Sequence, residues 1–102
     1  MNKIYKVSWK EIYERIELLE KDKKYYGIPR GGQVVAGLTK QAVQTPEEAD
    51  IIIDDLYDSG TTYKKWHKKY PNKQFKFLFD KTKEFKNTWL EFPWELSGEK
   101  EV

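Results

Sequence analysis

The chain has 102 residues, so it can bury only a small core, and we expect one domain over residues 1–102 that is stabilised by forming a homo-oligomer. Its 19 Lys and Arg against 17 Asp and Glu give a net charge of +2, too little to indicate a nucleic-acid-binding protein. The absence of cysteine and the single histidine exclude disulfides and zinc sites built from Cys and His, so a bound metal would need oxygen ligands.

The N-terminal region predicts a helix and no targeting signal. "MNKIYKVSWK" has no apolar stretch, and no run of 18 apolar residues follows it, so we expect a cytoplasmic protein without membrane contact. Ser8 and Glu11 form a capping-box pattern, and Ile12, Ile16 and Leu19 follow at helical spacing. These residues predict an amphipathic helix over residues 9 to 22.

Two further strand and helix pairs follow along the chain. "KYYGI" at 24 to 28 predicts a strand, and apolar residues at helical spacing predict a helix over 33 to 43 that ends before "QTPEE". "DIIID" at 50 to 54 predicts a second strand, "TYKKWHKKY" at 62 to 70 a helix that Pro71 ends, and "FKFLF" at 75 to 79 a third strand. Strands that alternate with helices predict an α/β fold: a small three-layer parallel sheet with right-handed crossovers.

The loops "PRGG" and "DDLYDSGTT" each lie where a predicted strand ends and a helix begins, so we expect them side by side at the carboxyl edge of the sheet. Arg30 between Pro29 and the glycines Gly31 and Gly32 suits an anion, because the backbone can approach it closely. The second loop ends in small residues whose hydroxyls and N–H groups suit a phosphate: Ser59, Gly60, Thr61 and Thr62.

Two acids precede this phosphate-type loop. Asp54 and Asp55 would repel a bare phosphate, but they could bind a cation or sugar hydroxyls, and a diphosphate chelated to magnesium fits both halves of the pattern. By itself an acid pair is also typical of a solvated turn, and "PRGG" of an ordinary glycine-rich turn.

The run "IIIDDLYDSGTT" resembles the signature of the type I phosphoribosyltransferases, and "GIPRGG" is similar to their pyrophosphate loop. The resemblance implies a Rossmann-like core in which Asp54, Asp55, Asp58, Ser59, Gly60, Thr61 and Thr62 bind phosphoribosyl pyrophosphate (PRPP). It also implies that Asp54 and Asp55 hold the ribose hydroxyls directly or through Mg²⁺, and that Asp58 is the general base. Arg30, Gly31 and Gly32 would hold the pyrophosphate, with a strained or cis peptide after Arg30.

The C-terminal third, "FLFDKTKEFKNTWLEFPWE", is similar to the base-binding end of bacterial xanthine-guanine phosphoribosyltransferases. That resemblance implies that Lys81 bonds the six-position oxo group, Trp89 stacks on the purine, and the main chain of Leu90 contacts its exocyclic edge. An aromatic face suits stacking, and an ammonium donor favours an oxo purine over an amino one. We expect Trp94 to pack in the core instead.

The resemblance implies a purine-salvage enzyme that transfers the phosphoribosyl group of PRPP to guanine, xanthine or hypoxanthine and releases pyrophosphate. "QAVQTPEEAD" is too short for the flexible hood loop of that family, so low activity or a lid from a neighbouring subunit is expected. The alternative is a non-catalytic module that binds PRPP or a nucleotide. A third interpretation, RNA binding by the lysine-rich stretch at 63 to 73, is weaker than that of a solvated helix face, so we expect no nucleic-acid partner.

Overall fold

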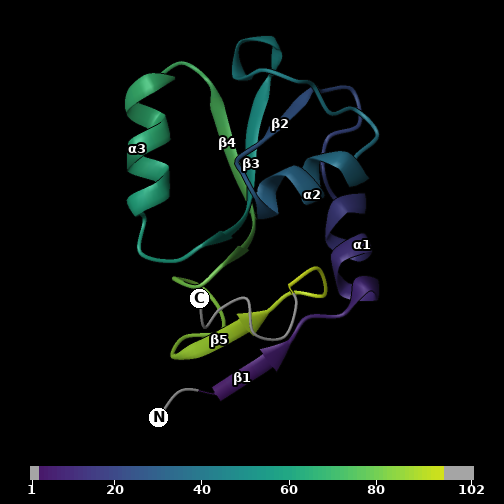
Figure 1. Cartoon of the computed structure of the whole chain (residues 1–102), viewed down its shortest axis with the longest axis vertical. Coiled ribbons are helices and arrows are strands. Elements are labelled where there is room, and N and C mark those ends of the chain that lie inside the picture. Colours follow the sequence, from purple (N-terminus) through teal and green to yellow (C-terminus); the bar gives the residue numbers. More distant parts are fainter. Residues whose placement is uncertain (1–2, 96–102) are drawn as a thin grey trace.

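The computed structural model describes residues 3–95, which form a mixed α/β structure with two small parallel sheets (Figure 1). The larger sheet has the strand order β2-β3-β4, with β2 at Tyr25–Gly27, β3 at Ile51–Tyr57 and β4 at Gln74–Asp80. The smaller sheet pairs β1 (Lys3–Lys6) with β5 (Thr88–Glu91). This architecture is compatible with a Rossmann-like core.

Three helices and one short 3-10 helix connect the strands: α1 (Trp9–Glu17), α2 (Gly31–Leu38), η1 (Pro46–Glu48) and α3 (Thr61–Lys69). Ser8 caps α1 as expected, because its side chain accepts a hydrogen bond from the Glu11 N–H. None of these helices, over the described residues 3–95, is long and apolar enough to cross a membrane.

Helices lie on both faces of the larger sheet. Tyr63 of α3 meets Phe75 and Phe77 of β4 edge to face, with ring centroids 5.3 and 6.2 Å apart. Side chains alternate along a strand, so Leu78 points to the other face, where it joins a core cluster with Ile12 of α1. Figure 1 shows α3 on one side of the sheet and α1 and α2 on the other, which gives the predicted three layers.

A short segment after α2 lies along β2. The Tyr25 N–H donates to the Gln41 carbonyl at 3.0 Å, the Val43 N–H donates to the Tyr25 carbonyl at 2.9 Å, and Ala42 forms a parallel bridge with Tyr25. The bonds to β3 leave from the neighbouring residue Lys24. Because successive residues of a strand bond toward opposite edges, this segment lies on the edge of β2 away from β3.

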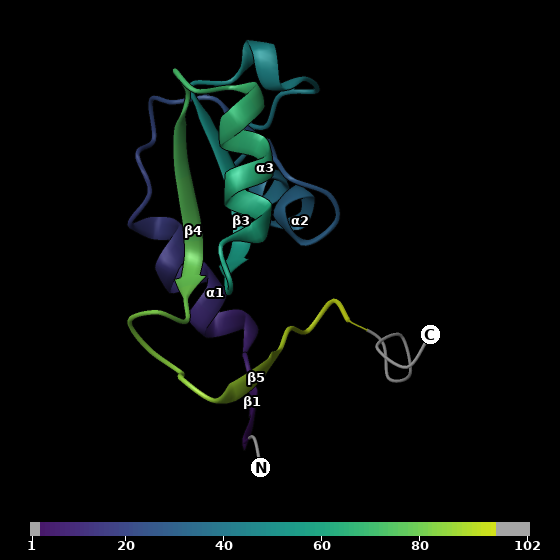
Figure 2. The ribbon, with the colours of Figure 1, turned by 90° about the vertical axis from the view of Figure 1, so that its left-hand side faces the viewer.

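The segment that follows β2 in the chain lies on one side of β2, whereas β3 and then β4 lie on its other side. The strand order therefore reverses between β2 and β3. Ligand sites of open α/β sheets lie at such a reversal, beyond the carboxyl ends of the strands. In Figure 2 the sheet of β1 and β5 lies below the carboxyl end of β4, on this same side of the larger sheet.

Several element boundaries differ from the sequence predictions. The first helix ends at Glu17 rather than residue 22, because the N–H groups of Leu18 and Leu19 bond three residues back and tighten the last turn. The second helix begins at Gly31 and ends at Leu38, rather than spanning 33 to 43. Two residues after its end, Lys40 takes a φ of 66°, and the chain turns there to run beside β2. No strand was predicted over β1 or β5, because "KIYK" and "TWLE" show neither an alternating pattern nor turn residues that bound a strand.

Candidate functional site

The two acids lie in the middle of β3 rather than in the loop after it, one and two residues beyond Ile53, which pairs with the last residue of β2. Asp54 is buried, and its Oδ1 accepts a hydrogen bond from the Asp55 N–H at 2.8 Å. Burial is the main cause that raises the pKa of Asp54 to about 8, and the negative charge of Asp55 adds to it. Burial likewise raises the pKa of Asp55. The pair is therefore a desolvated acid site that a cation or hydroxyl donors would stabilise in its charged form.

The glycine-rich loop lies directly against this acid pair. A Cβ atom on Gly31 would lie 1.9 Å from Asp55 Oδ2, and one on Gly32 would lie 2.6 Å from the Ile53 carbonyl oxygen and 3.1 Å from Asp54 Oδ1. A hydrogen bond from the Gly32 backbone to Asp54 partly offsets the rise in the pKa of that carboxyl. The predicted proximity of the two loops is confirmed, and the glycines are required by it.

Arg30 occupies the N-cap position of α2 and is exposed. Within residues 3–95 the structure has one cis peptide bond, which joins Pro29 to Arg30 and so does not precede a proline. The prediction of a strained or cis peptide after Arg30 is therefore wrong in its position, because the cis bond lies before Arg30.

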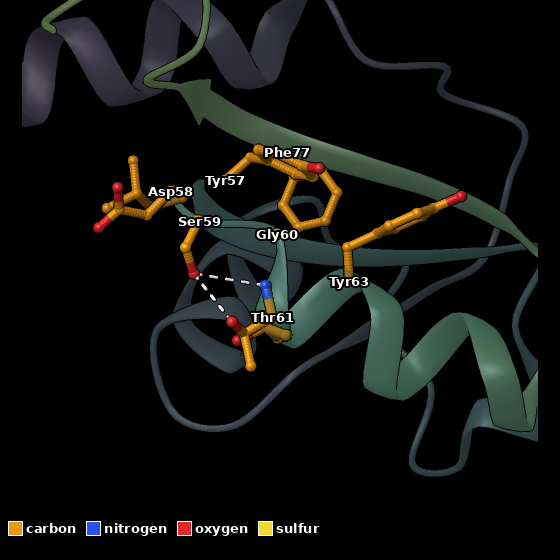
Figure 3. A pocket seen from close by; sticks show the side chains of 9 residues that line it. Tyr57, Asp58, Ser59, Gly60, Thr61, Tyr63 and Phe77 are labelled. Atoms are coloured by element: carbon orange, nitrogen blue, oxygen red, sulfur yellow. Dashed lines mark hydrogen bonds between the residues drawn. The ribbon is translucent and has the colours of Figure 1, made fainter.

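The second loop forms the N-terminal end of α3 (Figure 3). Ser59 Oγ lies 3.0 Å from Thr61 Oγ1 and accepts a hydrogen bond from the Thr61 N–H at 3.4 Å. Gly60 has a φ of 90°, a left-handed conformation that favours glycine, and a Cβ there would lie 2.7 Å from the Tyr57 hydroxyl. A cavity of about 50 Å³ lies between this loop and Phe77. Hydroxyls and N–H groups therefore gather at a helix N-terminus, as a phosphate site requires.

A larger cavity, of about 290 Å³, brings the acids together with the C-terminal residues. It is lined by Asp54, Asp55, Leu56, Asp58, Thr62, Lys81, Trp89, Leu90, Phe92 and Glu95. Lys81 Nζ lies 3.7 Å from Asp58 Oδ1, and the Lys81 N–H donates to the Tyr57 carbonyl at 2.9 Å. The Asp58 side chain is 65% exposed, whereas that of Lys81 is only 18% exposed. The predicted general base and the predicted oxo-group donor are thus neighbours.

Trp89 and Leu90 reach this cavity from β5. Trp89 is 46% exposed, so part of its side chain is accessible from the cavity, and Leu90 is buried. Trp94 is half-buried and stacks on Phe92 with ring centroids 4.9 Å apart, which confirms its expected packing against the core.

Glu95 is a lining residue that the sequence reasoning missed. Its Oε1 accepts a hydrogen bond from the Phe92 N–H at 3.0 Å, and its own N–H donates to the Phe92 carbonyl at the same distance. This turn brings the carboxylate back to the cavity. In the sequence, an acid two residues beyond a Pro is only a weak indication of a binding site. The turn between Phe92 and Glu95 is what places this carboxylate at the cavity.

The acid pair suits magnesium only as a partner of a bound diphosphate. Among residues 3–95, no three or more His, Asp or Glu side chains are arranged to hold a metal ion. Mg²⁺ commonly takes one or two carboxylates and completes its shell with substrate phosphates and water. Asp54 and Asp55 fit that use and would be the protein ligands, whereas a metal cage made by this part of the protein alone is not present.

The lysines of helix α3 do not line this cavity, which the helix reaches only through Thr62 at its start. Lys64, Lys65, Lys68 and Lys69 are exposed, and the aromatic side chains of the helix pack toward the sheet. His67 is half-buried and stacks on Tyr63 with ring centroids 5.2 Å apart. The histidine therefore packs between the helix and β4, away from the acids.

Comparison with known protein families gives no match, since none of the family models corresponds to this chain.

The raised pKa of Asp54 predicts a particular pH dependence of stability. Between about pH 4 and pH 8 the folded protein retains a proton that the unfolded chain has lost, so the free energy of unfolding should fall as pH rises. One such proton gives a slope of at most about 1.4 kcal/mol per pH unit. Urea unfolding of the native protein and of Asp54→Asn at several pH values measures this slope.

Asp54→Asn should lower the slope, because the amide does not titrate, and the slope that remains comes from Asp55, whose pKa burial also raises. Asp22→Asn, on an exposed turn, is the matched control and should leave the slope unchanged. Equal slopes for the native protein and Asp54→Asn would show that Asp54 is already ionised in the folded state.

Proposed function

We propose that this protein is a minimal purine phosphoribosyltransferase of type I, which transfers the phosphoribosyl group of PRPP to guanine, xanthine or hypoxanthine. One observation supports this proposal above all others. A single cavity between β3, the residue after β4, and β5 is lined by the acids of the PRPP-type motif and by Lys81, Trp89 and Leu90 from the C-terminal third. The two groups come from separate parts of the sequence. The resemblance assigns the acids to PRPP and the C-terminal residues to the purine, which are the two substrates of one reaction.

The reaction forms a bond between a purine ring nitrogen and the anomeric carbon of PRPP and breaks the bond from that carbon to pyrophosphate. Trp89 would stack on the purine, and Lys81 would donate a hydrogen bond to its oxo group. Asp58 would accept the imidazole-ring proton of the purine, from the ring nitrogen beside the oxo group, as the other imidazole nitrogen bonds the anomeric carbon. Because Lys81 Nζ and Asp58 Oδ1 are 3.7 Å apart, one purine can contact both along a single edge.

The phosphate end of PRPP would be held by the loop at the N-terminus of α3. Ser59, Thr61 and Thr62 supply hydroxyls, and the left-handed Gly60 allows the backbone to turn its N–H groups toward an anion. Asp54 and Asp55 would bind the ribose hydroxyls, and Arg30 would neutralise the departing pyrophosphate. Bound Mg²⁺ would supply further charge stabilisation of the pyrophosphate as it leaves.

The test is nucleotide formation from PRPP and Mg²⁺ with guanine, xanthine, hypoxanthine or adenine, followed by chromatography. We expect nucleotide with the oxo purines and much less with adenine, because Lys81 is a donor and pairs with an oxo group. No nucleotide with any base would refute the enzymatic proposal.

The second candidate is a PRPP- or nucleotide-binding module without catalysis. It is favoured by the short connection between α2 and β3, which covers only residues 39–50 and contains η1 as its sole helix. Such a connection leaves the cavity without a closing loop and exposed to water. A PRPP-dependent rise in the melting temperature without product would support the binder, whereas product would exclude it.

A further inference from the structure

One face of α1 carries large aromatic side chains that the fold does not bury. Trp9 is 43% exposed and Tyr13 is 51% exposed, although Ile12 and Ile16, which lie next to them on the same stripe of the helix, are buried. Residues four apart lie on one side of a helix, so Trp9 and Tyr13 form one row. Their ring centroids are 6.0 Å apart. The apolar stripe of the helix therefore extends beyond the core to an exposed border that these two rings form.

The row is continued by a third ring and is firmly attached to the core. Trp9 lies 5.9 Å from Trp94, which stacks on the buried Phe92, and Phe92 in turn meets Phe79 of β4 edge to face with centroids 5.5 Å apart. We call Trp9, Tyr13 and Trp94 the α1 aromatic patch. Because it is anchored through buried rings, ordering it on contact with a partner would cost little side-chain entropy.

A row of opposite charges runs beside the patch. Lys10 and Glu14 form an ion pair along the helix, with side chains 82% and 60% exposed. In a two-fold symmetric contact each surface meets an identical copy of itself, so a surface must carry both charges to be complementary. Two copies of α1 can pack antiparallel about a two-fold axis that crosses each helix midway between Lys10 and Glu14. Each Lys10 then faces the Glu14 of the other copy. The same arrangement brings Trp9 of each copy close to Tyr13 of the other.

We propose that the α1 aromatic patch, bordered by Lys10 and Glu14, is the surface through which two copies of this chain form a symmetric dimer. The partner is a second copy because the charge pattern is self-complementary and because a chain of this length buries a small core by itself. Trp and Tyr are also the residues that most often dominate binding at protein interfaces.

Within residues 3–95, β1 pairs only with β5, so its other edge is a competing surface for self-association, but its charges oppose this. All four residues of β1 are exposed, with Lys3 and Lys6 at its ends. Antiparallel pairing of two β1 strands about a two-fold axis would place Lys3 of one copy opposite Lys6 of the other, and like charges directly opposite are destabilising. Lysines of this kind protect an edge strand from pairing.

Sedimentation velocity of the full chain over a range of concentrations tests the proposal. We expect a monomer–dimer equilibrium, with self-association weakened about 100-fold by Trp9→Ser, because a two-fold contact loses the indole twice. Lys10→Glu should weaken it about tenfold or more by placing like charges opposite each other. The double variant Lys10→Glu with Glu14→Lys exchanges the charges and should recover most of the affinity.

Lys65→Glu makes the same charge change on α3, on the other side of the sheet, and should leave the dimer intact. Circular dichroism of each variant establishes that it remains folded. A chain that stays monomeric at all concentrations would overturn the proposal, as would a dimer that tolerates both Trp9→Ser and Lys10→Glu. Nucleotide formation is measured separately, so failure of the dimer and failure of the enzymatic proposal are distinguishable.

Discussion

Asp58→Asn should lower the rate of nucleotide formation from PRPP and an oxo purine by about 10²- to 10⁴-fold, the usual contribution of a general base. The amide keeps the size of the side chain but cannot accept the proton that the purine nitrogen releases. Asp58 lies in the cavity beside Lys81, and its side chain is 65% exposed, so the change should hardly affect stability. The rate is measured by chromatography of the nucleotide at saturating PRPP.

Two comparisons make that experiment specific. Asp22→Asn carries the same change on an exposed turn outside the cavity and should retain the native rate. PRPP should still raise the melting temperature of Asp58→Asn, because the other loop residues continue to bind it. An Asp58→Asn variant with native activity would remove Asp58 from the reaction while leaving the PRPP site intact.

Gly27→Ala should lower the free energy of unfolding by about 3 kcal/mol, the upper range for overpacking a rigid site. A Cβ on Gly27 would lie 2.0 Å from the Gly32 carbonyl oxygen and 2.6 Å from the Gln33 nitrogen. Both atoms belong to the backbone of α2, so no side-chain rotation can relieve the contact. The first turn of α2 would move away from Asp54 and Asp55, and PRPP binding should weaken along with stability. Urea unfolding measures the change.

Gly37→Ala is the matched control for Gly27→Ala. Gly37 lies near the end of α2. Among the described residues, no atom beyond its chain neighbours and the backbone of its own helix would lie within 4 Å of a Cβ at this position. Alanine has the higher helix propensity, so this change should raise the free energy of unfolding by about 0.5 kcal/mol. If both variants were equally stable, the close approach of β2 to α2 would be wrong.

Local patterns were sufficient to predict the larger sheet and the residues at its carboxyl edge. The run Ile51 to Ile53 has no polar alternation, which is typical of a central strand, and this strand is buried on both faces. The capping pattern at Ser8 and the glycines at 31 and 32 were equally local, since each depends on neighbours within a few residues. The sequence therefore determined which residues form the two loops and that these loops lie together.

Tertiary structure decided the features that depend on residues far apart in the chain. The pairing of Lys3 with Thr88 joins strands too short to be recognised by periodicity, and it places Trp89 beside the cavity. The bridge between Tyr25 and Ala42 fixes the reversal of strand order, which no local pattern encodes. Burial and the neighbouring Asp55 set the pKa of Asp54, because desolvation depends on everything packed around a carboxyl group rather than on its place in the sequence.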